Sequence, residues 1–176
     1  VEEKGDGTEV TLARERRFRC EYLIGADGSE SVVAKSLSLP LPQGDGKGMA
    51  VESEIPFESA VDFPEKELQL IHLDFGRIPN GYGWVFPKSE GLSIGIGGMP
   101  REGKKVNPRQ YFVDFLKGLN YLDEGKVERI VGHSLPSFYD ERQRVSGGRF
   151  LLVGDSGHMI DPLTGEGIYY ALLSGM

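Results

Sequence analysis

Two short apolar runs, each ending in a glycine and an aspartate, constrain the fold of this chain more than any other feature. Residues 22–26 lead into Asp27-Gly28, and residues 150–153 lead into Gly154-Asp155. Continuous apolar runs of this length are typical of strands buried on both faces of a parallel sheet. A helix-like segment follows each run. Because ligands bind at the carboxyl ends of such strands, the sequence predicts an α/β unit with its site at these two ends.

The sequence between the two runs has the pattern of an antiparallel sheet. Strands are predicted at residues 49–55, 68–75, 82–86, 92–96 and 127–135, and several of them alternate large and small residues with period two. Asn107-Pro108 predicts the start of a helix, with asparagine as its cap. The predicted fold is therefore α/β with an inserted antiparallel sheet (α+β).

Three segments follow from this pattern. Residues 1–43 and 141–176 are predicted to form one partial domain, and residues 44–140 the inserted sheet with one helix. Residues 1–20 are predicted to form a hairpin around the turn at Gly5, Asp6 and Gly7. The chain starts at Val1 and stops within a predicted helix, so we expect it to be part of a longer polypeptide.

Composition excludes several classes of function. The chain has 20 Lys+Arg and 27 Asp+Glu, a formal net charge of −7, which argues against binding nucleic acid or an anionic membrane through charge. No apolar run reaches the ~20 residues that span a bilayer. The single cysteine, Cys20, excludes an internal disulfide. The three histidines lie too far apart in sequence for a local metal motif, so no metal site is predicted.

Residues 161–168 are the richest candidate site. Asp161-Pro162 predicts a turn, and Thr164 can cap a following helix. Gly165 and Gly167 would expose backbone N–H groups at the start of that helix, beside Ile168. Two glycines there cost helix stability, so we expect a ligand at this helix start, where the helix dipole favours negative charge.

An aromatic stripe is the second candidate site. Tyr82, Trp84 and Phe86 alternate with Gly83 and Val85, which places the three rings on one face of a strand. Such a stripe is either protein core or the wall of a pocket for a long apolar molecule. Glycine within a strand often marks the close approach of a ligand or backbone, and both interpretations stay open.

The segment Gly154-Asp155-Ser156-Gly157-His158 suggests a different chemistry. It resembles the surroundings of the nucleophilic serine in trypsin-like proteases, except that His158 replaces a glycine. It also misses the G-x-S-x-G motif at that position. A serine hydrolase is therefore a minor alternative.

Several motifs together resemble one known family. Gly25-Ala26-Asp27-Gly28 with Ser31, and Gly154-Asp155 with Asp161-Pro162, are similar to two motifs of flavoproteins of the para-hydroxybenzoate hydroxylase class. Within that class, residues 79–87 resemble the Pro-x-x-Tyr-x-Trp-x-Phe-Pro signature of geranylgeranyl reductases. Residues 161–171 are similar to the flavin segment of the same reductases.

The resemblance implies an FAD-dependent oxidoreductase that reduces carbon–carbon double bonds of an isoprenoid chain. It implies a partial Rossmann-like domain in which Asp155 binds the ribose of FAD and the start of the last helix faces the flavin pyrimidine. The implied cofactor-binding residues are Asp27, Gly28, Gly154, Asp155, Pro162, Thr164, Gly165, Gly167 and Ile168; the implied substrate-binding residues are Tyr82, Trp84 and Phe86. No side chain is singled out as a general acid.

Partners and alternatives remain open at this point. NAD(P)H or another carrier would supply electrons. A cytoplasmic location is expected, with peripheral membrane contact as an option. The main alternative is an FAD-dependent aromatic hydroxylase or a halogenase-like monooxygenase. A third hypothesis is that the isolated chain folds without binding a cofactor and is inactive by itself.

Overall fold

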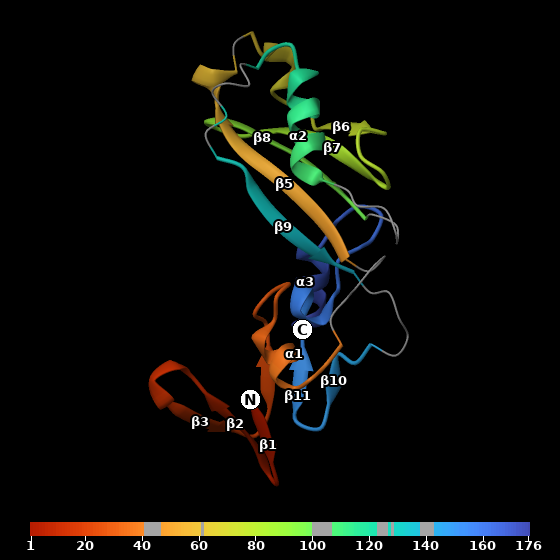
Figure 1. Cartoon of the computed structure of the whole chain (residues 1–176). Coiled ribbons are helices and arrows are strands. Elements are labelled where there is room, and N and C mark those ends of the chain that lie inside the picture. The colour runs from red at the N-terminus through yellow and green to blue at the C-terminus, as the bar shows by residue number, and fades with distance from the viewer. Residues whose placement is uncertain (41–46, 61, 100–106, 123–126, 128, 138–142) are drawn as a thin grey trace. The chain divides into compact units, whose positions relative to one another are not determined.

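The computed structural model describes residues 1–40, 47–60, 62–99, 107–122, 127, 129–137 and 143–176. They form two compact units (Figure 1). The first comprises Val1–Lys47 and Leu135–Met176, and the second comprises Gly48–Ser134. The chain therefore leaves the first unit, builds the second, and returns to the first. Both expected boundaries, at 43/44 and 140/141, lie outside the described residues.

The first unit begins with a small antiparallel sheet. Its strands are β1 (Glu2–Lys4), β2 (Gly7–Thr11) and β3 (Arg17–Cys20), in that order. Gly5 lies in the turn that joins β1 to β2. Its φ of +54° is a backbone conformation that glycine adopts without steric cost. The expected hairpin is thus extended by a third strand.

A second sheet in this unit holds the two glycine–aspartate strand ends. Its order is β10 (Ser146–Gly147), β11 (Phe150–Leu152) and β4 (Leu23–Gly25). β11 and β4 are parallel, with Leu152 opposite Gly25, so their carboxyl ends lie at the same edge. The prediction of parallel neighbours is confirmed.

The expected burial on both faces of these strands is wrong for the described chain. Ile24 is 61% exposed and Leu151 45% exposed, while Phe150 and Leu152 are buried against Ala34. Ala34 belongs to α1 (Val32–Ser36), which covers one face. No described element covers the side chains of the other face.

The second unit is a five-stranded antiparallel sheet with a helix. The strand order is β6 (His72–Phe75), β7 (Gly81–Pro87), β8 (Gly91–Gly98), β5 (Lys47–Pro56) and β9 (Val131–Pro136). Two strands start later than predicted. Before β6, a short 3-10 helix (Glu65–Glu67) occupies the chain, and β9 begins at Val131 rather than at residue 127.

One face of this sheet packs against α2 (Pro108–Lys117) to form the core. Asn107 caps the helix, as predicted, by accepting a hydrogen bond from the Gln110 N–H. Phe112, Phe115 and Leu116 of α2 are buried together with sheet residues that include Val85, Leu92, Ile94 and Ile96. The opposite face therefore carries the alternate residues of each strand. The fold is mixed α+β, as predicted.

No helix among the described residues has the length and apolar character needed to cross a bilayer.

Candidate functional site

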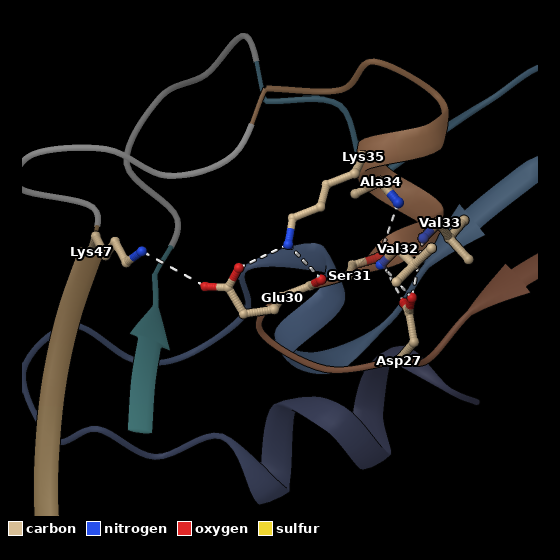
Figure 2. Close-up of polar contacts among 8 residues, drawn as sticks. All are labelled: Asp27, Glu30, Ser31, Val32, Val33, Ala34, Lys35 and Lys47. Atoms are coloured by element: carbon tan, nitrogen blue, oxygen red, sulfur yellow. Dashed lines mark hydrogen bonds and ion pairs between the residues drawn. The ribbon is translucent and has the colours of Figure 1, made fainter. Parts of the chain in front are cut away.

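Asp27 follows β4 and organises the start of α1 (Figure 2). Its Oδ2 accepts hydrogen bonds from the N–H groups of Val32 (2.7 Å) and Val33 (3.1 Å). Its Oδ1 accepts one from the Ser31 hydroxyl at 2.6 Å, and Ser31 Oγ in turn accepts the Ala34 N–H. Partial burial opposes ionisation of Asp27, but these hydrogen bonds outweigh it and hold the pKa of the carboxyl below its ordinary value.

These contacts bear on the predicted role of Asp27. Its carboxylate caps a helix, so its main service in the described chain is to fix the loop that contains Gly28. Gly28 has a φ of +80°, and a Cβ built on it would meet no atom within 4 Å. The backbone at Gly28 is therefore open to a ligand. Figure 2 also shows Glu30 between Lys35 (2.8 Å) and Lys47 (3.7 Å), an exposed ion-pair group.

Ser156 ties the ends of the two parallel strands together. It lies in the 3-10 helix η6 (Gly154–Gly157), is fully buried, and donates its hydroxyl hydrogen bond to the Gly25 carbonyl. A backbone bond from Val153 to Gly25 (3.0 Å) adds to this connection. The serine-hydrolase hypothesis is therefore wrong: this hydroxyl is shielded from substrate and serves the backbone.

Asp155 carries a carboxylate that lacks a hydrogen-bond partner within the described part of the chain. It is half-buried, and burial raises its pKa above the ordinary value. A Cβ on Gly167 would lie 3.3 Å from Asp155 Oδ1. The predicted residues Asp155 and Gly167 are thus brought together, although eleven positions separate them in the sequence. Gly154, with a φ of +56°, turns the chain between β11 and Asp155.

The loop before the last helix is built around Asp161. Its Oδ1 accepts hydrogen bonds from the Leu163 N–H, the Thr164 N–H (2.8 Å) and the Thr164 hydroxyl (2.9 Å). The bonds from Thr164 are the main cause that lowers the pKa of Asp161. Thr164 therefore serves the loop and does not cap the helix, which corrects the expected capping role. Pro162 lies within the same turn.

Only part of the expected N–H cluster faces outward. Gly165, with a φ of +73°, donates its N–H to the Asp161 carbonyl, and the Tyr169 N–H donates to Glu166 Oε1. The N–H groups of Gly167 and Ile168 have no acceptor among the described residues. They start α3 (Ile168–Ser174). The described part of the site therefore offers two backbone donors and one unpaired carboxylate.

His158 was not predicted to have a special role. Its side chain is 2% exposed, its backbone has a φ of +60°, and neither ring nitrogen has a partner in the described part of the chain. Burial lowers the pKa of its imidazole. The sequence feature that could have indicated this is the position of His158 just after Gly154-Asp155. There His158 adopts a left-handed backbone conformation and ends η6.

The aromatic residues lie on the sheet face opposite α2. Trp84 stacks against Phe86 with ring centroids 6.0 Å apart, and Tyr82 lies 6.1 Å from Trp84 on the other side. Phe75 of β6 continues the row beside Tyr82 (5.7 Å). The four rings are hereafter called the aromatic row. Gly83 and Val85 face the core instead, so the alternation is confirmed.

The glycines near the aromatic row do not leave empty space beside it. A Cβ on Gly95 would lie 2.0 Å from Cζ2 of Trp84, and one on Gly83 would lie 2.8 Å from Phe115. The Trp84 ring lies flat on β8 because Gly95 has no side chain. The space over these glycines is therefore filled by the protein's own rings.

The described residues do not form a metal centre, since no three His, Cys, Asp or Glu side chains gather among them.

The chain matches a known protein family along almost its whole length. Residues 2–172 match the family described as FAD binding domain. Digeranylgeranylglycerophospholipid reductase 3 of Methanosphaera stadtmanae is 30% identical over 100% of this chain and 44% of its own length. The chloroplastic geranylgeranyl diphosphate reductase of rice, Oryza sativa subsp. japonica, is 30% identical over 91% of this chain and 33% of its own length. The chain thus spans less than half of the curated relatives it matches.

Solved structures are similar along almost the whole chain. A geranylgeranyl bacteriochlorophyll reductase-like protein from Thermoplasma acidophilum matches with a TM-score of 0.81 at 26% identity, over 100% of this chain and 45% of that one. The anhydrotetracycline hydroxylase OxyS from Streptomyces rimosus matches with a TM-score of 0.59 at 20% identity, over 98% and 34%. The second likeness concerns the fold alone.

Proposed function

The chain belongs to the FAD binding domain family, and from that premise we propose that the full-length protein reduces carbon–carbon double bonds of an isoprenoid chain. In this proposal the first unit holds part of the FAD molecule and the aromatic row of the second unit holds the substrate. The resemblance to geranylgeranyl reductases supports the substrate class.

The residues of the first unit fit FAD. Asp155 supplies an unpaired carboxylate, which is a hydrogen-bond acceptor for the hydroxyl groups of a ribose. The unpaired N–H groups of Gly167 and Ile168 are donors for the oxygen and nitrogen acceptors at the flavin pyrimidine edge. Gly28 has a positive φ and open space where a Cβ would stand, so a planar ligand can come close to the backbone there. The observation that carries the assignment is Asp155, because an unpaired half-buried charge costs stability unless a ligand uses it.

The remaining predicted cofactor residues act through the backbone. Asp27 fixes the Gly28 loop, and Thr164 and Pro162 shape the turn that presents Gly167. When bound, FAD supplies the hydride chemistry, and this chain supplies position and electrostatics.

The aromatic row fits the apolar chain of the proposed substrate. Its four rings form a continuous apolar strip on the face of the sheet that α2 leaves open. Each methylene that leaves water on such a strip contributes up to about 0.8 kcal/mol. Tyr82, Trp84 and Phe86 would therefore bind long chains more tightly than short ones.

The electron donor and the location belong to the same proposal. NAD(P)H is the donor we propose for the full-length protein, and a lipid substrate would bring it into peripheral contact with membranes.

The product decides the proposed function. Purified full-length protein is reduced without oxygen and incubated with a geranylgeranyl substrate, and the product is weighed by mass spectrometry. We expect the mass to rise by two hydrogens for each double bond reduced. A product that gains oxygen would instead support the monooxygenase alternative, and an unchanged substrate would contradict the proposal.

A further inference from the structure

A glutamate–histidine pair lies beside the aromatic row on the same face of the sheet. Strand register places Trp84 opposite Gly95, and Gly95 opposite Glu52. His133 Nε2 lies 3.0 Å from Glu52 Oε1. Directly opposite residues of neighbouring strands point to one face. The strands β7, β8, β5 and β9 are neighbours in that order, so the side chains of Trp84, Glu52 and His133 follow one another across the sheet, with Gly95 between the first two.

Gly95 lets the Trp84 ring lie close to Glu52. Gly95 carries no side chain, and the Trp84 ring lies over it. The next side chain toward β9 is that of Glu52. A molecule lying along the aromatic row would thus meet the Glu52–His133 pair one strand away.

The pair is open to solvent and belongs to no core. The side chains of Glu52 and His133 are 33% and 49% exposed, whereas Val51 and Ile55 of the same strand point into the core. Nδ1 of His133 has no hydrogen-bond partner among the described residues. Of the other charged groups of this face, Glu54 is held by Lys88 at 2.6 Å. Exposure lets the imidazole exchange protons with water, and the open Nδ1 can face a ligand.

The proposed reduction needs a proton donor. Saturating a double bond adds a hydride to one carbon and a proton to the other. An isoprenoid double bond has no carbonyl that could accept negative charge, so the proton must arrive with the hydride or before it. Positive charge then develops on the more substituted carbon. Aromatic faces stabilise such charge, and Trp is the best of them.

We propose that His133 donates this proton and that Glu52 positions it; this inference rests on the proposed function. The π electrons of the double bond form a new C–H bond with the Nδ1 proton of the imidazolium, and the N–H electron pair remains on the ring. Reduced FAD, when bound, would supply the hydride chemistry for the other carbon. Glu52 accepts the Nε2–H, which orients the ring. Water then restores the proton to Nδ1.

Two variants of the full-length protein test the proposal. We expect His133→Gln to lower kcat by about 100-fold, the usual contribution of general acid catalysis, and Glu52→Gln to lower it by about 10-fold, with KM unchanged for both. His72→Gln is the matched control, because His72 lies on the same sheet opposite the core residue Val85. Its kcat should equal that of the wild type. Circular dichroism and bound FAD verify that each variant is folded.

A binding experiment on the chain itself gives a readout independent of turnover. Farnesol is titrated into the chain while the three histidine Cε1–H resonances are followed by NMR, with His133→Gln supplying the assignment. We expect the His133 resonance to shift more than those of His72 and His158. An unmoved His133 resonance would overturn the proposal.

The outcomes separate this proposal from the proposed function. If the wild type reduces the isoprenoid and His133→Gln does so at the same rate, His133 is not the acid and the proposed function stands. A loss of activity in Tyr82→Phe with none in His133→Gln would likewise assign the proton to Tyr82 and overturn the inference. If the wild type reduces no isoprenoid, both fall together.

Discussion

At the scale of single residues, Asp155 should affect stability and cofactor binding in opposite directions. Its folded pKa is raised by burial, so the folded chain binds this proton more strongly than the unfolded chain. The free energy of unfolding therefore falls as pH rises from the ordinary value of 3.8 through the raised value. We expect Asp155→Asn to remove this fall in urea unfolding of the chain without FAD. An unchanged pH dependence would contradict the account.

The same residue should be needed when FAD is bound. In the full-length protein, we expect Asp155→Ala to weaken FAD binding by about 1.5–3 kcal/mol, the range for a hydrogen bond to a charged group, which is tenfold or more in Kd. Asp74→Ala is the control, since Asp74 is only partly buried and is paired with Arg77 in the other unit. Equal FAD titrations for Asp155→Ala and the wild type would remove Asp155 from the site.

His158 should give the chain a separate dependence on pH. Burial lowers its folded pKa below 6.5, so the unfolded chain takes up this proton first as pH falls. Stability is full above that value and is lost as pH falls from 6.5 toward the lowered one. Asp27 and Asp161 act in a lower window, below pH 3.8, because their pKa values are depressed. We expect His158→Asn, which tolerates positive φ, to flatten the melting temperature between pH 7 and 5, about the histidine range. The same slope in His158→Asn and in the wild type would refute the assignment.

At the scale of elements, two glycine variants distinguish the conformational cost of a side chain from an effect on ligand binding. Gly165 has a φ of +73°, and alanine there costs about 1 kcal/mol. Gly5 has a φ of +54° in the β1–β2 turn, with nothing near its Cβ position. We expect Gly165→Ala and Gly5→Ala to lose similar stability in the chain, and only Gly165→Ala to weaken FAD binding in the full-length protein. If both bind FAD as the wild type does, Gly165 serves the turn alone.

The aromatic row should contribute less to stability than the core on the other face of the same sheet. Phe112 of α2 is fully buried, and Phe112→Ala should cost about 3–5 kcal/mol. Trp84 is partly exposed, so Trp84→Ala should cost less than about 3 kcal/mol. In the full-length protein its kcat/KM should fall more for geranylgeranyl than for dimethylallyl substrates. An equal fall for both, with a collapse in Tm, would return Trp84 to the core.

At the scale of the whole molecule, the pattern of the sequence predicts the elements better than their surroundings. Period two in β7 and β8 and the Asn107-Pro108 start of α2 follow from local physics, and the structure confirms both. The parallel pairing of β4 and β11 follows from two apolar runs with the same ending. The prediction that Ile24 and Leu151 are buried was wrong. Their burial depends on what covers the sheet, which the apolar sequence of the strands does not determine.

The sequence indicates which segments carry the candidate site, but not the contacts between their side chains. Thr164 was expected to cap a helix, yet its hydroxyl is three residues from Asp161, the spacing at which the two bond to each other. The Glu52–His133 pair joins residues 81 positions apart, a contact that no local pattern indicates. The aspartate–glycine ends and the aromatic stripe, by contrast, follow directly from the sequence.

Reoxidation of the reduced flavin distinguishes a reductase from a monooxygenase. Full-length protein is reduced with dithionite and mixed in a stopped-flow instrument, first with a geranylgeranyl substrate without oxygen and then with oxygen and the same substrate. We expect the absorption band of oxidised flavin to return in the first mixture, at a rate that depends on substrate concentration. A flavin that stays reduced there, and that forms a hydroperoxide band in the second mixture, would contradict the reductase and establish a monooxygenase.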